Sequence, residues 1–173
     1  MRRKCKFFIS DIYSGWFDIF FEIKETKIDI SASNIWGKDA PKEWLQLLID
    51  WMLEKTEAAY VLFDGEPGIS IVSLEKETLT IAYAKCDFLK EKKTKISSYG
   101  NMTFNEISQL ITMEEISLQE KVDVKVLIQS VYKAFLKYAK TYLLYDKYEE
   151  NWDIFPQKEW ELFEQCIKQK EWN

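Results

Sequence analysis

The chain has 173 residues, of which 47% are apolar, 31% charged and 16% aromatic, and its net charge is -5. This length and balance predict one globular domain spanning residues 1–173 and exclude a disordered chain. The acidic charge argues against nucleic acid as a partner and suits a basic protein partner.

The first part of the chain predicts an antiparallel meander followed by a helix. Three segments alternate apolar and polar residues, as half-buried strands do: 6–12, 16–24 and 27–33. The segment Asp39-Ala40-Pro41 predicts a helix start, because Asp is a good cap and Pro fits the first helical position. Apolar residues then recur at helical spacing to about Lys55.

The second part predicts more strands and then helices. The further strands are 58–64, 69–75 and 78–86. A basic loop, Phe88–Ser98, follows them. Thr103 and Glu106 fit a capping box for a helix over 104–113. Asp123 predicts the start of a helix that runs to about Tyr145, and Pro156 opens a last helix.

This order of elements predicts the fold class. Strands and helices are segregated, without βαβα alternation, so we expect an α+β domain. The sheet is expected to be an antiparallel meander of about five strands, covered by about four helices. A single domain is expected because the amphipathic C-terminal helices need a sheet to cover.

The absence of histidine limits the possible chemistry. The chain has no His, so the usual Ser-His-Asp and Cys-His nucleophiles and His-ligated metal sites are excluded. Glycine-rich phosphate loops are also missing. These observations favour binding over catalysis, and we expect no cofactor and no metal.

The cysteines and the hydropathy predict the compartment. Cys5, Cys86 and Cys166 are far apart and form no CxxC motif, so we expect reduced thiols in a cytoplasmic protein. No run of 18 apolar residues occurs, and no membrane-spanning helix is expected.

A turn with two acids divides two apolar runs in the stretch Tyr60–Val72 (YVLFDGEPGISIV). Asp64 and Glu66 could hold a divalent metal or act as an acid–base pair, which would make the protein a carboxylate enzyme. The alternative is a hairpin turn whose acids point into solvent. The turn is also the second candidate docking site, and its edge could instead support a homo-oligomeric structural or regulatory protein.

The first candidate docking site lies in the segment Tyr142–Trp160, where acidic and aromatic residues are interleaved. Aromatic residues serve as interface anchors, and acids steer a basic partner. We expect the partner-binding residues to be Tyr148, Glu149, Glu150, Trp152 and Asp153. The alternative is that the aromatic residues pack onto the core and the acids form a solvated face.

The overall layout resembles a known class of proteins. An aromatic-rich strand opening, the helix WLQLLIDWML, the turn DGEPG with alternating strands, and C-terminal helices with an aromatic-acidic end span residues 16–165. In this layout the chain resembles immunity proteins of bacterial polymorphic toxins and contact-dependent inhibition systems. The resemblance implies a non-catalytic intracellular protein that binds and neutralises a cognate basic toxin domain.

Overall fold

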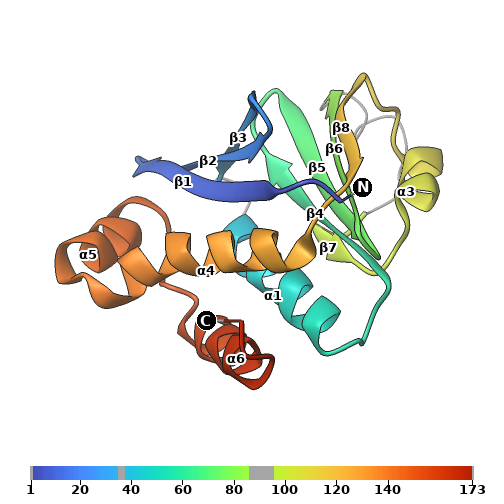
Figure 1. The fold of residues 1–173 in the computed structure, drawn as a ribbon. Coiled ribbons are helices and arrows are strands. Elements are labelled where there is room, and N and C mark those ends of the chain that lie inside the picture. The colour runs from blue at the N-terminus through green and yellow to red at the C-terminus, as the bar shows by residue number, and fades with distance from the viewer. Residues whose placement is uncertain (1, 35–37, 86–95, 173) are drawn as a thin grey trace.

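Eight strands form two antiparallel sheets in the computed structural model, which describes residues 2–34, 38–85 and 96–172 (Figure 1). The first sheet has the order β1-β2-β3 and consists of Cys5–Tyr13, Trp16–Ile23 and Thr26–Ser33. The second has the order β7-β4-β5-β6-β8 and consists of Tyr99–Gly100, Ala58–Asp64, Gly68–Glu75, Thr78–Lys85 and Glu115–Lys121. The predicted α+β class is confirmed, but the strands form two sheets instead of one meander.

The described residues contain the helices α1 (Ala40–Met52), α3 (Phe104–Leu110), α4 (Val124–Lys140), α5 (Tyr142–Asn151) and α6 (Gln157–Gln169). The predicted caps start three of them. Asp39 and Asp123 each accept a hydrogen bond at 3.2 Å from a backbone N–H in the first turn of α1 and α4. Thr103 and Glu106 form the capping box of α3. Each cap satisfies an N–H group that the helix itself cannot pair.

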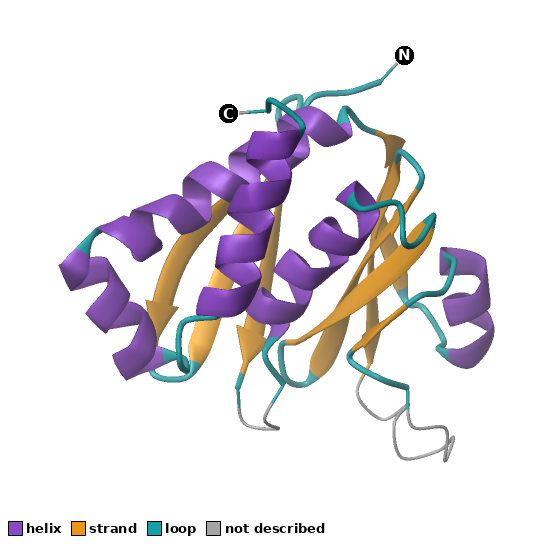
Figure 2. Cartoon of the chain, turned by 90° about the horizontal axis from the view of Figure 1, so that it is seen from below, coloured by secondary structure: helices purple, strands orange, loops and turns teal. Residues whose placement is uncertain are grey.

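The main core lies between the sheets and the layer of helices α1, α4 and α6, which Figure 2 shows across one face of the strands. Trp44 of α1 packs on Phe7 and Phe21 of the first sheet, with ring centroids 6.1 and 5.9 Å apart. On the opposite face of the second sheet, Ile107 of α3 joins a smaller apolar cluster with Leu62. Because both faces of this sheet are covered, β4 is a continuous apolar run.

Two local predictions differ from the structure. The helix that was expected to run from Asp123 to Tyr145 breaks at Thr141, whose backbone is extended, with φ -110° and ψ 109°. The break lets α5 fold back, so that Tyr148 packs against Tyr138 at a centroid distance of 6.1 Å. Strand β8 was not predicted. Leu118 is its one buried side chain, so the sequence shows no alternation there, and the strand forms by pairing with β6.

The cysteines and the basic loop can be placed only in part. Cys5 and Cys166 are buried free thiols. Cys86 and most of the predicted basic loop Phe88–Ser98 lie outside the described residues.

Candidate functional site

Helix α5 is held by one face and presents the other face to solvent. On its inner face, the Tyr148 ring lies 6.0 Å from the Phe17 ring, and Lys147 Nζ lies 2.6 Å from Asp11 Oδ1 of β1. At the C-terminal end of α5, the Asn151 carbonyl oxygen accepts the Gly15 N–H at 2.7 Å and ties the helix to the turn between β1 and β2. Residues three and four positions apart lie on the same side of a helix, so the side of α5 opposite these contacts faces solvent. We call this side the outer stripe.

The outer stripe combines exposed apolar and acidic side chains. Tyr142, Leu143 and Ile154 are 78%, 77% and 76% exposed, which is unusual for large apolar residues. Four acids lie between the two apolar ends. We call the whole set the acidic α5 face: Tyr142, Leu143, Asp146, Glu149, Glu150, Asp153 and Ile154.

The charges of this face are not compensated locally. Among residues 2–34, 38–85 and 96–172, none of its four carboxylates belongs to an ion pair. Glu149 Oε1 accepts the Phe155 N–H at 3.3 Å, the Tyr145 hydroxyl also donates to the Glu149 carboxylate, and Asp153 Oδ1 accepts the following N–H at 2.7 Å. The cation nearest in sequence, Lys147, points to Asp11 instead. The face therefore carries a negative potential toward solvent.

The structure corrects two of the predicted docking residues. Tyr148 is fully buried, and Trp152 is 5% exposed. The Trp152 ring packs on Phe17 at 5.5 Å, and Tyr148 packs edge-on against Phe155 at 5.1 Å. Both aromatic residues are therefore core residues and cannot anchor a partner. Glu149, Glu150 and Asp153 are exposed.

The apolar residues of the face were not among the predicted docking residues, which were aromatic or acidic side chains near the end of α5. Tyr142, Leu143 and Ile154 lie inside the predicted segment Tyr142–Trp160 but outside the selected residues 148–153. Helical spacing is the signal that links two of them to the acids of α5: Tyr142 lies four and seven positions before Asp146 and Glu149, and Leu143 lies seven positions before Glu150.

The turn Asp64–Gly68 is packed against the first sheet. Asp64 is 3% exposed, and the Lys38 ammonium lies 3.6 Å from its Oδ2. A Cβ at Gly65 would lie 2.7 Å from the Ser31 carbonyl oxygen of β3. The expectation that both turn acids point into solvent is wrong for Asp64, because this end of β4 lies at the seam with β3. Glu66 is half-buried.

This burial also removes Asp64 from the candidate docking residues. A carboxylate that is 3% exposed cannot contact a partner. The described residues contain no group of three or more Cys, Asp or Glu side chains able to hold a metal ion. The Lys38 ammonium also supplies the positive charge beside Asp64.

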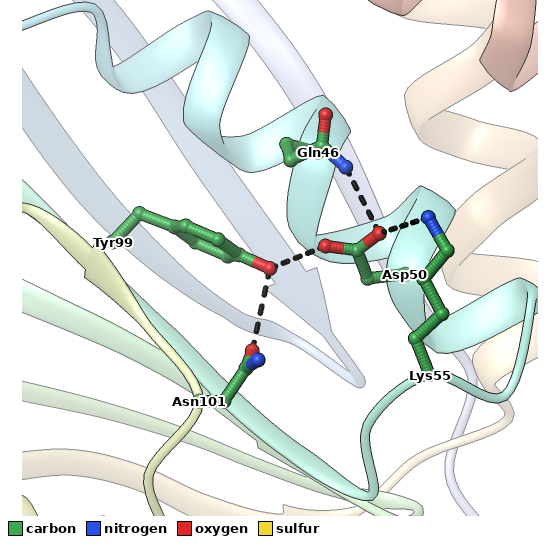
Figure 3. Close-up of polar contacts among 5 residues, drawn as sticks. All are labelled: Gln46, Asp50, Lys55, Tyr99 and Asn101. Atoms are coloured by element: carbon green, nitrogen blue, oxygen red, sulfur yellow. Dashed lines mark hydrogen bonds and ion pairs between the residues drawn. The ribbon is translucent and has the colours of Figure 1, made fainter.

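A separate polar cluster joins α1 to β7 (Figure 3). The Tyr99 hydroxyl donates to Asp50 Oδ2 at 2.6 Å, while Gln46 Nε2 and Lys55 Nζ donate to Asp50 Oδ1 at 2.9 and 3.1 Å. Burial raises the pKa of Asp50, but these three hydrogen bonds outweigh it and hold the pKa below its ordinary value. Burial and the bond to Asp50 raise the pKa of Tyr99. With both carboxylate oxygens engaged, the cluster fixes β7 onto α1.

No family model, curated protein or solved structure matches the chain. Within the described residues, every helix is too short or too polar to cross a membrane.

Proposed function

We propose that this protein is a non-catalytic binding protein whose acidic α5 face docks a basic protein. The observation that carries the proposal is the pattern of that face: four carboxylates without ion-pair partners among the described residues, between exposed apolar ends at Leu143 and Ile154. Exposed apolar side chains supply contact area, and unpaired acids select a partner of opposite charge.

The partner that fits this face best is a cognate basic toxin domain, which makes the protein an immunity protein that acts in the cytoplasm. The net charge of -5 and the layout resemblance support this choice. Steering by uncompensated acids raises the association rate with a cationic protein, and rapid capture is what neutralisation requires.

Neither alternative gains support from the geometry. A metal enzyme built on Asp64 and Glu66 would need an accessible carboxylate pair, but Asp64 is buried beside Lys38. A homo-oligomer formed through the turn would need that turn to be free, but Gly65 lies against Ser31 of β3.

The proposal is tested first by the neighbourhood of the gene and then by rescue of growth. We expect a large secreted protein with a variable C-terminal domain to be encoded immediately upstream. Cells that express this C-terminal domain should stop growing, and co-expression of the present protein should restore growth. Failure of the folded protein to restore growth, or to bind the purified domain, would contradict the proposal.

Variants locate the docking surface in the same assay. Leu143→Ser with Glu150→Lys should abolish rescue. The matched pair Leu53→Ser with Glu54→Lys alters an exposed leucine and an exposed acid just after the C-terminal end of α1, and it should leave rescue intact. If both double variants lose rescue equally, the effect is not specific to the acidic α5 face and the interface is not assigned to α5.

A further inference from the structure

A groove of about 520 Å³ lies between the edge strand β1 and helix α4. Apolar side chains from both elements line it, including Phe8 and Ile9 of β1 and Val126 of α4. Leu144, at the start of α5, closes one side. A volume of this size lies within the range of roughly 300–1,000 Å³ that is typical of small-ligand sites.

The groove is not suited to a peptide that would add a further strand beside β1. The Phe7 N–H points away from β2 and donates to Ser130 Oγ of α4 at 2.8 Å. The same hydroxyl donates to the Leu127 carbonyl oxygen at 2.6 Å, which fixes its position. An incoming strand would have to displace Ser130 from this edge. Side chains, and not free backbone groups, therefore define what the groove accepts.

The charged residues of the groove all have one sign. Lys6, Lys133 and Lys137 line it, and the described lining contains no Asp or Glu. Lys6 has Glu22 at 3.7 Å, whereas Lys133 and Lys137 form no ion pair within the described residues. In a protein of net charge -5, this is a local positive rim around an apolar interior.

We propose that the groove binds a small amphipathic carboxylate, whose apolar part lies among Phe8, Ile9 and Val126 and whose carboxylate meets Lys133 and Lys137. Charge complementarity selects the anion, and the apolar lining selects a hydrocarbon or aromatic body. Lys133 and Lys137 are one helical turn apart on α4, so that both ammonium groups can reach one carboxylate.

Calorimetric titration with decanoate, 1-decanol and decyltrimethylammonium tests the proposal. The three probes share a ten-carbon chain and differ in charge. We expect saturable binding of decanoate at one site, at least about fivefold tighter than 1-decanol, and no saturable binding of the cation. Absence of saturable decanoate binding, or equal affinity for the cation, would overturn the proposal. So would an acidic peptide that binds at the groove where decanoate does not.

Two double variants of α4 place the site. Lys133→Glu with Lys137→Glu should weaken decanoate binding at least about tenfold. Lys125→Glu with Lys140→Glu makes the same charge change on the same helix outside the groove, and it should weaken binding less than about threefold, because screened distant charges contribute little. Equal losses in the two variants would assign the effect to net charge and overturn the site.

A third variant tests the apolar interior. Val126→Trp should fill the groove and weaken both decanoate and 1-decanol, with an unchanged circular dichroism spectrum confirming the fold. None of these substitutions touches the acidic α5 face, so the groove and the proposed function can fail separately. Unchanged decanoate binding by folded Val126→Trp would exclude the groove as the site.

Discussion

The indole N–H of Trp152 donates a hydrogen bond to Asp39 Oδ1 at 3.2 Å and joins two residues that are 113 positions apart in the chain. Asp39 is the cap of α1, and Trp152 ends α5. Burial raises the pKa of Asp39, and the bonds from Trp152 and from the Lys42 backbone N–H offset part of that effect. One carboxylate thus fixes the start of one helix and the end of another.

Replacing Trp152 with alanine should destabilise the protein strongly. The variant loses the packing on Phe17 and the bond to Asp39, and large aromatic truncations in a core cost about 3–5 kcal/mol. Urea denaturation measures the change in the free energy of unfolding. Ile154→Ala, two residues away and 76% exposed, is the matched control and should change it by less than about 0.5 kcal/mol. A Trp152→Ala loss as small as that of the control would mean that Trp152 is a surface residue.

Tyr148→Phe should leave the protein as stable as the parent or more stable. The ring of Tyr148 is buried against Phe17 and Phe155, but its hydroxyl has no hydrogen-bond partner among the described residues. Removing a buried, unpaired hydroxyl recovers its desolvation cost, up to about 1 kcal/mol. Thermal melting would show an equal or higher midpoint. A loss above about 1 kcal/mol would instead reveal a partner for the hydroxyl.

Asp50→Asn should lower the free energy of unfolding at neutral pH and lower it much less in acid. The folded state lowers the pKa of Asp50, so its contribution to stability is complete above the unfolded value of about 3.9 and is lost as the pH falls through the folded value. The difference in the free energy of unfolding between parent and variant should therefore shrink below about pH 4.

Denaturation at several pH values measures this difference for Asp50→Asn. Tyr99→Phe removes the strongest of the Asp50 contacts and should reduce the same acid-side dependence in part. A difference between parent and Asp50→Asn that stays constant from pH 7 to about pH 3 would contradict the assignment.

Gly65→Ala should destabilise the protein by about 1–3 kcal/mol, because its Cβ would lie 2.7 Å from a backbone oxygen of Ser31 and two strands would have to separate. Glu66→Ala, at the neighbouring half-buried position of the same turn, is the comparison for a general change in the turn. Chemical denaturation of the two variants distinguishes the close approach from the turn itself. Equal losses in both would argue against a specific contact at Gly65.

Charge and apolar contact on the acidic α5 face should affect different rate constants. Glu149→Lys with Glu150→Lys should slow association with the basic partner, and the effect should fade as salt is added. Leu143→Ala should mainly speed dissociation, by about tenfold if it is an anchor worth above 1 kcal/mol. Surface plasmon resonance against the partner domain measures both rates.

Glu25→Lys with Glu54→Lys is the matched control for the kinetic experiment. It makes the same charge change at exposed acids away from α5. If this pair slows association as much as Glu149→Lys with Glu150→Lys, the steering comes from net charge and not from α5. If Leu143→Ala leaves dissociation unchanged, Leu143 is outside the interface.

The elements that local chemistry specifies were predictable from the sequence. Asp39, Asp123 and the Thr103–Glu106 box mark helix starts because a cap acts within one turn of its own position. The strands of the first sheet were predictable because alternation reports burial of one face. Strand β8 was not, because it has one buried side chain and forms only by pairing with β6.

The candidate site was predictable only in part. The sequence locates Glu149, Glu150 and Asp153 in an acidic run, and acids of this kind stay in solvent wherever the helix lies. It does not distinguish an apolar anchor from an apolar core residue, because Tyr148 and Leu143 are both large apolar side chains five positions apart on one helix. Which of them is buried depends on the angle at Thr141.

The sequence by itself determined the α+β class, the starts of α1, α3, α4 and α6, the absence of histidine chemistry and the acidic charge, because each depends on residue type or on neighbours within a few positions. The tertiary structure alone decided that the strands form two sheets, that Asp64 lies beside Lys38, and that Trp152 reaches Asp39. These outcomes depend on long-range packing. A side chain is buried or exposed according to which distant segments pack against it, and the local sequence pattern does not show which segments those are.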